Sequence, residues 1–95
     1  MLPTTILALD GALASSVAIT IDVLAMANRI RLAAGRRPAF DVRLEGSGAA
    51  HFRPFLAFPE AEHHHPQLLV VPAQGFSKAE SYQARLSAAD AAAGI

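Results

Sequence analysis

Cysteine is absent from the 95-residue sequence, so disulfides and thiolate metal sites are impossible within it. An excess of charge of one sign is also lacking, because 8 basic and 8 acidic residues give a formal net charge of zero. Nucleic-acid binding depends on neutralising phosphates with Lys and Arg, so this segment is a poor candidate for DNA contact. The sequence has no P-loop, no dinucleotide-binding glycine motif and no zinc-finger spacing. We therefore expect neither a cofactor nor a metal site.

Long apolar runs are missing too, and none reaches the length needed to span a bilayer. The first nine residues have no basic region and no long apolar core, so a signal peptide is not expected. A cytoplasmic protein without membrane contact is the expectation. Hydrophobic residues nevertheless make up 53% of the chain, and much of that is alanine. Because a chain this short buries a small share of its surface, the excess predicts a partner chain or a remainder of the domain.

Residue patterns predict alternating strands and helices. Thr4 to Leu9 is typical of a short buried strand, and Leu68 to Val71 of a central parallel strand. Phe40 to Leu44 alternates apolar and polar residues, as a half-buried strand does. His51 to Phe58 is expected to form one or two short strands, confined by Pro54 to an edge or a bulge. Ser77 to Ala93 has helical character.

The longest predicted helix begins with Ser15 or Ser16 as its cap and runs to about Ala34, with Gly35 at its C-cap. It carries two apolar stripes. One comprises Ile19, Val23, Met26 and Ile30, and the other Val17, Ile21, Leu24 and Leu32. A helix on the outside of a finished monomer usually has one stripe, so two indicate cover on both sides, by a sheet and by a second layer or a partner chain.

The predicted order β-α-β-β-β-α favours an α/β sandwich with an open, mostly parallel sheet, and only three or four strands are present. We therefore expect the fold to be incomplete within residues 1–95. Right-handed crossovers would place the first helix on one face of the sheet.

Two features are candidates for a ligand site. The first is the turn formed by Pro72, Ala73, Gln74 and Gly75, which follows a buried strand at its carboxyl end, where ligands sit in open α/β sheets. Its backbone N–H groups would hold an oxyanion or carboxylate; the alternative is an ordinary strand-to-helix turn. The second is Asp22, which is either exposed on the helix flank or held near the sheet with a raised pKa.

Histidine and serine residues offer weaker candidates. The run from His63 to His65 invites a metal-binding interpretation, but consecutive histidines cannot all turn to one ion, so a solvated loop is expected. His51 stands alone and is interpreted as a strand-end residue. Ser15 and Ser16 lack a nearby base and are interpreted as caps rather than nucleophiles.

Three stretches together resemble the amino-terminal half of a ThiJ/PfpI-like domain of the class I glutamine amidotransferase-like superfamily. They are "ILALDGALASSVAITIDVLAMANRI", "FDVRLEGSG" and "LLVVPAQG". The variant fused to an AraC-type helix-turn-helix module in bacterial transcriptional regulators is the most similar. "TIDVL" followed by "ANRI" matches its "PLEVF" and "ANR" stretches, with Asp22 in place of the usual Glu. "LLVVPAQG" matches "LLVPGG", with Ala73 and Gln74 where Gly is commoner.

The resemblance implies a flavodoxin-like α/β sandwich. In its enzymatic members a Cys on a strand-to-helix elbow is the nucleophile, and the positions that match the surrounding site are Asp22, Ala73, Gln74 and Gly75. That elbow would lie beyond Ile95, so these residues by themselves are expected to be non-catalytic and to bind a ligand.

In the regulator branch the domain senses a small-molecule effector and dimerises, while DNA contacts belong to a separate carboxyl-terminal module. We therefore expect a homodimeric sensing segment of an AraC-family regulator. The alternatives are a fragment of a ThiJ/PfpI-type peptidase, amidase or glyoxalase-like enzyme, and a standalone interaction domain.

Overall fold

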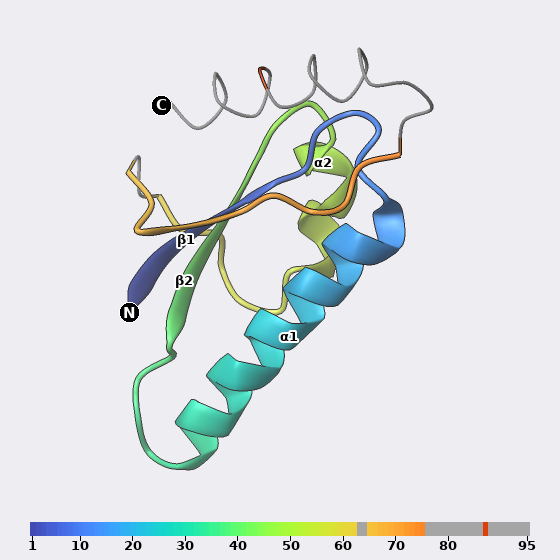
Figure 1. Ribbon diagram of the computed structural model, residues 1–95. Coiled ribbons are helices and arrows are strands. Elements are labelled where there is room, and N and C mark those ends of the chain that lie inside the picture. The colour runs from blue at the N-terminus through green and yellow to red at the C-terminus, as the bar shows by residue number, and fades with distance from the viewer. Residues whose placement is uncertain (63–64, 76–86, 88–95) are drawn as a thin grey trace.

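Three strands within the described residues form one parallel sheet in the order β2-β1-β3 in the computed structural model (Figure 1). These strands are β1 (Leu2–Leu7), β2 (Phe40–Glu45) and β3 (Leu68–Val70). In the register of the sheet, Leu2 lies opposite Phe40 and Thr4 opposite Leu68. Parallel strands flanked by helices confirm the expected α/β class and parallel sheet.

The structure describes residues 1–62, 65–75 and 87. The predicted helix from Ser77 to Ala93 therefore lies outside the described residues, apart from Ser87. Within the described part of the chain, no helix has the length and apolar character needed to cross a membrane.

The long helix α1 (Ala14–Ala33) begins one or two residues before the predicted serine cap. Its N-cap residue is Leu13, and no side chain among the described residues caps that end. The cap prediction is wrong because the helix starts before both serines, so Ser15 and Ser16 lie inside its first turn. The Ser16 hydroxyl instead accepts a hydrogen bond from the N–H of Ala73 at 3.0 Å. Ser16 thus ties the start of the helix to the segment after β3.

The other end of α1 follows the prediction. Gly35 has a φ of 74°, a left-handed conformation that glycine adopts without strain. Its N–H donates to the carbonyl of Leu32 at 3.0 Å, and the N–H of Arg36 donates to the carbonyl of Arg31 at 2.9 Å. This pair of bonds is the Schellman motif, and it satisfies carbonyls that the helix end would otherwise leave unpaired.

The two predicted stripes of α1 face opposite environments. The face toward the sheet is buried and comprises Val17, Ile21, Leu24, Ala25 and Asn28. Every member of the opposite stripe is exposed, at 63% for Ile19, 60% for Val23, 54% for Met26 and 63% for Ile30. Leu32 departs from the prediction, being 47% exposed, because the last turn of α1 extends past the strands (Figure 1). One face of α1 therefore holds the core, and the other presents apolar side chains to solvent.

Helical turns replace the strands predicted between His51 and Phe58. Helix α2 (Ala49–Phe52) leads directly into the 3-10 helix η1 (Arg53–Phe55). Pro54 sits in the first turn of η1, where its missing N–H costs nothing and its fixed φ suits a helix. The same proline that suggested an edge strand therefore favours a helical turn, and His51 is an exposed helix residue rather than a strand end.

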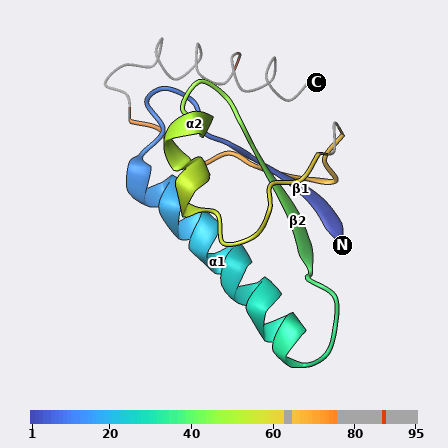
Figure 2. The same cartoon turned by 180° about the vertical axis from the view of Figure 1, so that it is seen from behind.

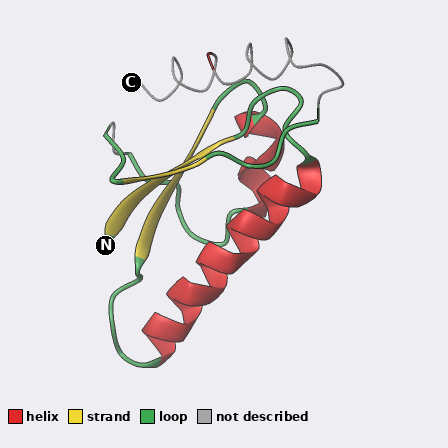
Figure 3. Cartoon of the chain, in the orientation of Figure 1, coloured by secondary structure: helices red, strands yellow, loops and turns green. Residues whose placement is uncertain are grey.

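Helices α1 and α2 cover the same face of the sheet, as the view from behind and the view coloured by secondary structure both show (Figures 2 and 3). One buried cluster joins the three elements, and it consists of Ile6, Ala8, Val17, Ile21, Leu24, Leu44, Ala49 and Phe52. Burying a side chain the size of Ile or Leu contributes about 1.5–3 kcal/mol, so this cluster is the main stabilising feature of the described part.

Candidate functional site

The carboxyl ends of the strands meet around the segment that leaves β1. Ala8 is fully buried there, and its carbonyl accepts a hydrogen bond of 2.6 Å from the N–H of Gly48. The N–H of Asp10 donates to the Ser47 hydroxyl at 2.9 Å. The turn after β2 is thus fastened to the exit of β1. This edge of the sheet is where ligands bind in open α/β folds, at the point between β1 and β3 where the strand order reverses.

The turn after β3 is fastened to the same segment. The N–H of Leu13 donates to the carbonyl of Ala73 at 2.8 Å, and the N–H of Gly75 donates to the carbonyl of Gly11 at 2.7 Å. The N–H of Ala73 is the group that bonds the Ser16 hydroxyl. Two of the three backbone N–H groups predicted to face a ligand, those of Ala73 and Gly75, are therefore engaged by the chain itself.

Gln74 is the residue of this turn whose side chain has an unsatisfied acceptor. Its side-chain Nε2 donates to the carbonyl of Pro72 at 2.8 Å. Its Oε1 is buried and has no hydrogen-bond partner among the described residues, the one such side-chain atom found there. Leaving a buried acceptor unpaired costs about 1–3 kcal/mol. A hydrogen-bond donor that reached Oε1 would remove this cost.

Asp22 lies apart from this turn. It is exposed, which decides between the two environments that the sequence left open. Asp22 is six residues beyond Ser16, or about 9 Å further along the helix axis at 1.5 Å per residue. No hydrogen bond within the described residues joins Asp22 to Ala73, Gln74 or Gly75, so Asp22 is separate from the turn that the other three predicted site residues form.

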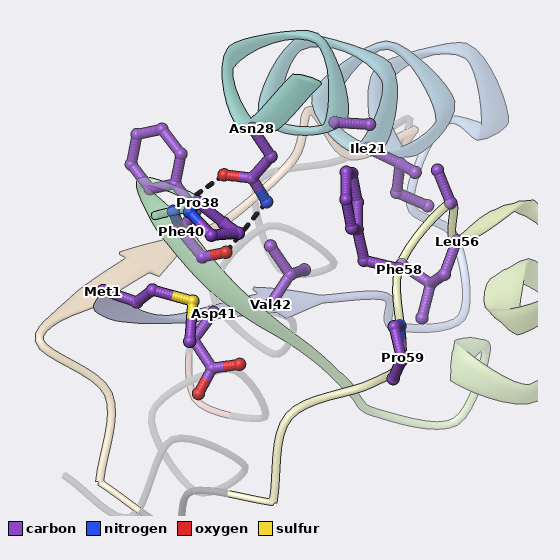
Figure 4. Close-up of a pocket in the computed structure, with 12 residues that line it drawn as sticks. Met1, Ile21, Asn28, Pro38, Phe40, Asp41, Val42, Leu56, Phe58 and Pro59 are labelled. Carbon is purple, nitrogen blue, oxygen red and sulfur yellow. Dashed lines mark hydrogen bonds between the residues drawn. The ribbon is translucent and has the colours of Figure 1, made fainter. Parts of the chain in front are cut away.

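An apolar pocket of about 260 Å³ lies between α1, the beginning of β2 and the loop at 56–59 (Figure 4). Its lining residues are Met1, Ile21, Ala25, Asn28, Pro38, Phe40, Asp41, Val42, Leu56, Ala57, Phe58 and Pro59. Phe58 reaches from the loop toward α1 (Figure 4). The pocket thus offers mostly apolar contact, away from the turn that carries Gln74.

Asn28 lines this pocket, but both polar atoms of its side chain are already hydrogen-bonded to the main chain. Its Nδ2 donates to the carbonyl of Phe40 at 2.9 Å, and its Oδ1 accepts from the N–H of Phe40 at 2.9 Å (Figure 4). The amide therefore pairs with both main-chain groups at the start of β2. Asn28 is 2% exposed, and the sequence interpretation missed its role. A signal existed, because a polar residue continues the buried stripe of α1 one turn beyond Leu24.

Glu60 has a similar role further along β2. Its Oε2 accepts from the N–H of Leu44 at 2.8 Å, and its Oε1 accepts from Nε of Arg53 at 2.8 Å. Burial raises the pKa of Glu60, but these two hydrogen bonds and the charges of Arg53 and Arg43 outweigh it. The pKa of the carboxyl is therefore below its ordinary value of 4.5. No local spacing in the sequence indicated this contact.

Metal ligands do not gather in the described part of the chain. No group of three or more His, Cys, Asp or Glu side chains there is arranged to hold an ion. His65 is exposed, and His63 and His64 lie outside the described residues.

Comparisons with protein-family models, with curated proteins and with solved structures find no match for this chain. What the chain does is therefore inferred from its strand order, its turn after β3 and its surfaces. The resemblance to ThiJ/PfpI-like domains stays a prediction.

Proposed function

We propose that this chain is the amino-terminal part of a flavodoxin-like, ThiJ/PfpI-type sensor domain of an AraC-family transcriptional regulator. In this proposal the chain binds a small effector, self-associates and is not catalytic. The regulator acts in the bacterial cytoplasm and contacts DNA through a separate carboxyl-terminal module.

The strand order supports the layering part of the proposal. The order β2-β1-β3, with all three strands parallel, is the beginning of the 2-1-3-4-5 order of flavodoxin-like sheets. In such a sheet further strands extend from β3. The equal numbers of acidic and basic residues support the assignment of DNA contacts to another module.

The single observation that carries the effector site is the unpaired Oε1 of Gln74 at the point where the strand order reverses. An acceptor favours a ligand with N–H or O–H donors, and amines and primary amides are the simplest of these. Because Nε2 of Gln74 is tied to Pro72, the amide presents its oxygen in a fixed direction. An effector is therefore recognised by donating to Gln74.

The enzymatic alternative has less support. Its nucleophilic cysteine is absent from these residues, and the acidic residue that would assist it is exposed and outside the turn. A carboxylate has to lie within hydrogen-bond reach of the reacting group to act on it. No hydrogen bond or ion pair of Asp22 within the described residues supports such a role.

A ligand screen by NMR tests the effector site. We expect members of a panel of small amines and primary amides to shift the backbone amide signals of residues 11–13 and 73–75. Gln74→Leu removes the acceptor and should weaken binding about tenfold, the loss of one hydrogen bond to a buried partner. Gln67→Leu is the matched control, since Gln67 is exposed and outside the turn. Equal binding by both variants would contradict the site.

The DNA assignment is tested by fluorescence anisotropy with a labelled duplex. We expect no salt-dependent binding by residues 1–95, because the net charge is zero. Tight binding that weakens as salt rises would refute the proposal that DNA contacts lie elsewhere.

A further inference from the structure

The exposed stripe of α1 has the spacing of a helix–helix seam. Its four members follow one another at intervals of four, three and four residues, and they are Ile19, Val23, Met26 and Ile30. Such alternating intervals are the a and d positions of a heptad pattern, whose side chains insert between those of a facing helix. Each of the four is at least 54% exposed, although all are large and apolar. The stripe is therefore suited to a second helix rather than to water.

Two opposite charges border one side of this seam. Asp22 and Arg29 are seven residues apart, which is nearly two turns of helix, so they lie on the same flank of the stripe. Both are exposed, and no ion pair of either is found among the described residues. The opposite flank carries Thr20 and Ala27, which are uncharged. The charges are thus confined to one flank of the stripe, and a facing helix would meet them on that flank only.

We propose that α1 is the interface of a homodimer in which two copies of this helix pack antiparallel. A twofold axis between residues 24 and 25 sets Val23 against the partner's Met26, and Ile19 against the partner's Ile30. The same axis sets Asp22 beside the partner's Arg29, and Arg29 beside the partner's Asp22. This places apolar with apolar and acid with base throughout the seam.

A parallel pair would not achieve this match. Each residue would then lie level with its own copy, so Asp22 would be level with the partner's Asp22 and two turns from the partner's Arg29. Charged residues on the flanks of a helix seam set orientation more than affinity. The self-complementary charge pattern is what selects a second copy of this chain as the occupant. The inference rests on the self-association within the proposed function, and it does not depend on the effector site.

Sedimentation velocity over a range of concentrations tests the interface. We expect reversible dimers of the wild-type chain. Val23→Glu should weaken association about a hundredfold, because each of the two Val23–Met26 contacts across the dimer is lost and a carboxylate is buried in its place. Leu32→Glu is the matched control on the same helix, since Leu32 is 47% exposed but off the seam, and it should dimerise as the wild type does. Far-UV circular dichroism verifies that both variants are folded.

Charge reversal tests the orientation. Asp22→Arg and Arg29→Asp should each weaken the dimer about tenfold, since each turns two attractive pairs into repulsive ones. The double variant restores both pairs and should return to within about twofold of the wild type. Because the chain has no cysteine, Ser15→Cys provides a single site for a spin label. The antiparallel arrangement predicts a distance of about 30 Å between the two labelled positions, from the helix rise of 1.5 Å per residue.

The outcomes separate this interface from the wider proposal. A monomeric wild-type chain would overturn both the interface and the self-association part of the proposed function. A dimer that Val23→Glu leaves intact would overturn the α1 interface alone. A double variant without rescue, together with closely spaced labels, would overturn the antiparallel pairing.

Discussion

The exit of β1 and the outer edge of β2 are held in different ways. At the exit of β1, most of the hydrogen bonds join two main-chain groups, as between Gly48 and Ala8 and between Gly75 and Gly11, and the hydroxyls of Ser16 and Ser47 each accept one more. Along the outer edge of β2, the side chains of Asn28 and Glu60 make most of the hydrogen bonds to the main chain, and the N–H of Ala61 makes one. The first kind of contact depends on backbone conformation, and the second depends on residue identity. Substitutions at the two places should therefore fail for different reasons.

The largest effect is expected at the exit of β1, from Gly46→Ala. Gly46 has a φ of 109°, and an added Cβ would lie 2.8 Å from the carbonyl oxygen of Ala8. Both the conformation and the contact are unfavourable, so we expect a loss of about 3 kcal/mol or more in the free energy of unfolding. Urea denaturation measures it. Gly35→Ala is the control, because Gly35 shares a positive φ but its Cβ would meet nothing within 4 Å. Equal losses in the two variants would show that the close approach to Ala8 is unimportant.

A smaller effect is expected at the edge of β2, from Asn28→Ala. The substitution leaves the N–H and carbonyl of Phe40 without partners, and we expect a loss of about 2 kcal/mol. The same denaturation experiment measures this loss. Gln67→Ala, which truncates an exposed amide, should stay within about 0.5 kcal/mol of the wild type. If Asn28→Ala is no worse than Gln67→Ala, side chains do not hold this edge.

The smallest effect is expected from Glu60, and it depends on pH. The folded-state pKa of Glu60 is depressed, so its contribution is fully present above a pH of about 4.5 and is lost as the pH falls through the folded-state pKa. Glu60→Gln should cost no more than about 1 kcal/mol at neutral pH, because the side chain of Arg53 is 47% exposed and solvent weakens the ion pair. Unfolding curves at neutral and acidic pH should show the two proteins converging in acid. Glu62→Gln, an exposed neighbour, should show no such convergence.

Features of the fold that depend on local patterns were predictable from the sequence. The helical spacing of apolar residues, together with Gly35, predicted the C-terminal end of α1 to within one residue. The alternation after Phe40 and the apolar run at Leu68 correctly placed β2 and β3. In each case the signal and the structure lie within a few residues of each other.

Features that depend on distant partners were not predictable. The hydroxyl of Ser16 bonds Ala73, which is 57 residues away, so no local pattern distinguished this role from a cap. Glu60 reaches Leu44 across 16 residues for the same reason. The stretch around Pro54 was ambiguous rather than silent, since a proline suits both an edge strand and the first turn of a helix. In the ligand turn, the sequence indicated Ala73, Gln74 and Gly75 together. Only the structure shows that Gln74 has the one buried side-chain polar atom without a hydrogen-bond partner among the described residues.

The groups bonded along the outer edge of β2 also bear on aggregation at high protein concentration. A bare strand border is a template for further strands, and such borders nucleate amyloid-like stacking. Here Asn28 occupies both groups of Phe40, the N–H of Ala61 occupies the carbonyl of Val42, and Glu60 occupies the N–H of Leu44. These main-chain groups are therefore not available to pair with a strand of another chain, so further strands can add to the sheet at β3 but not at β2.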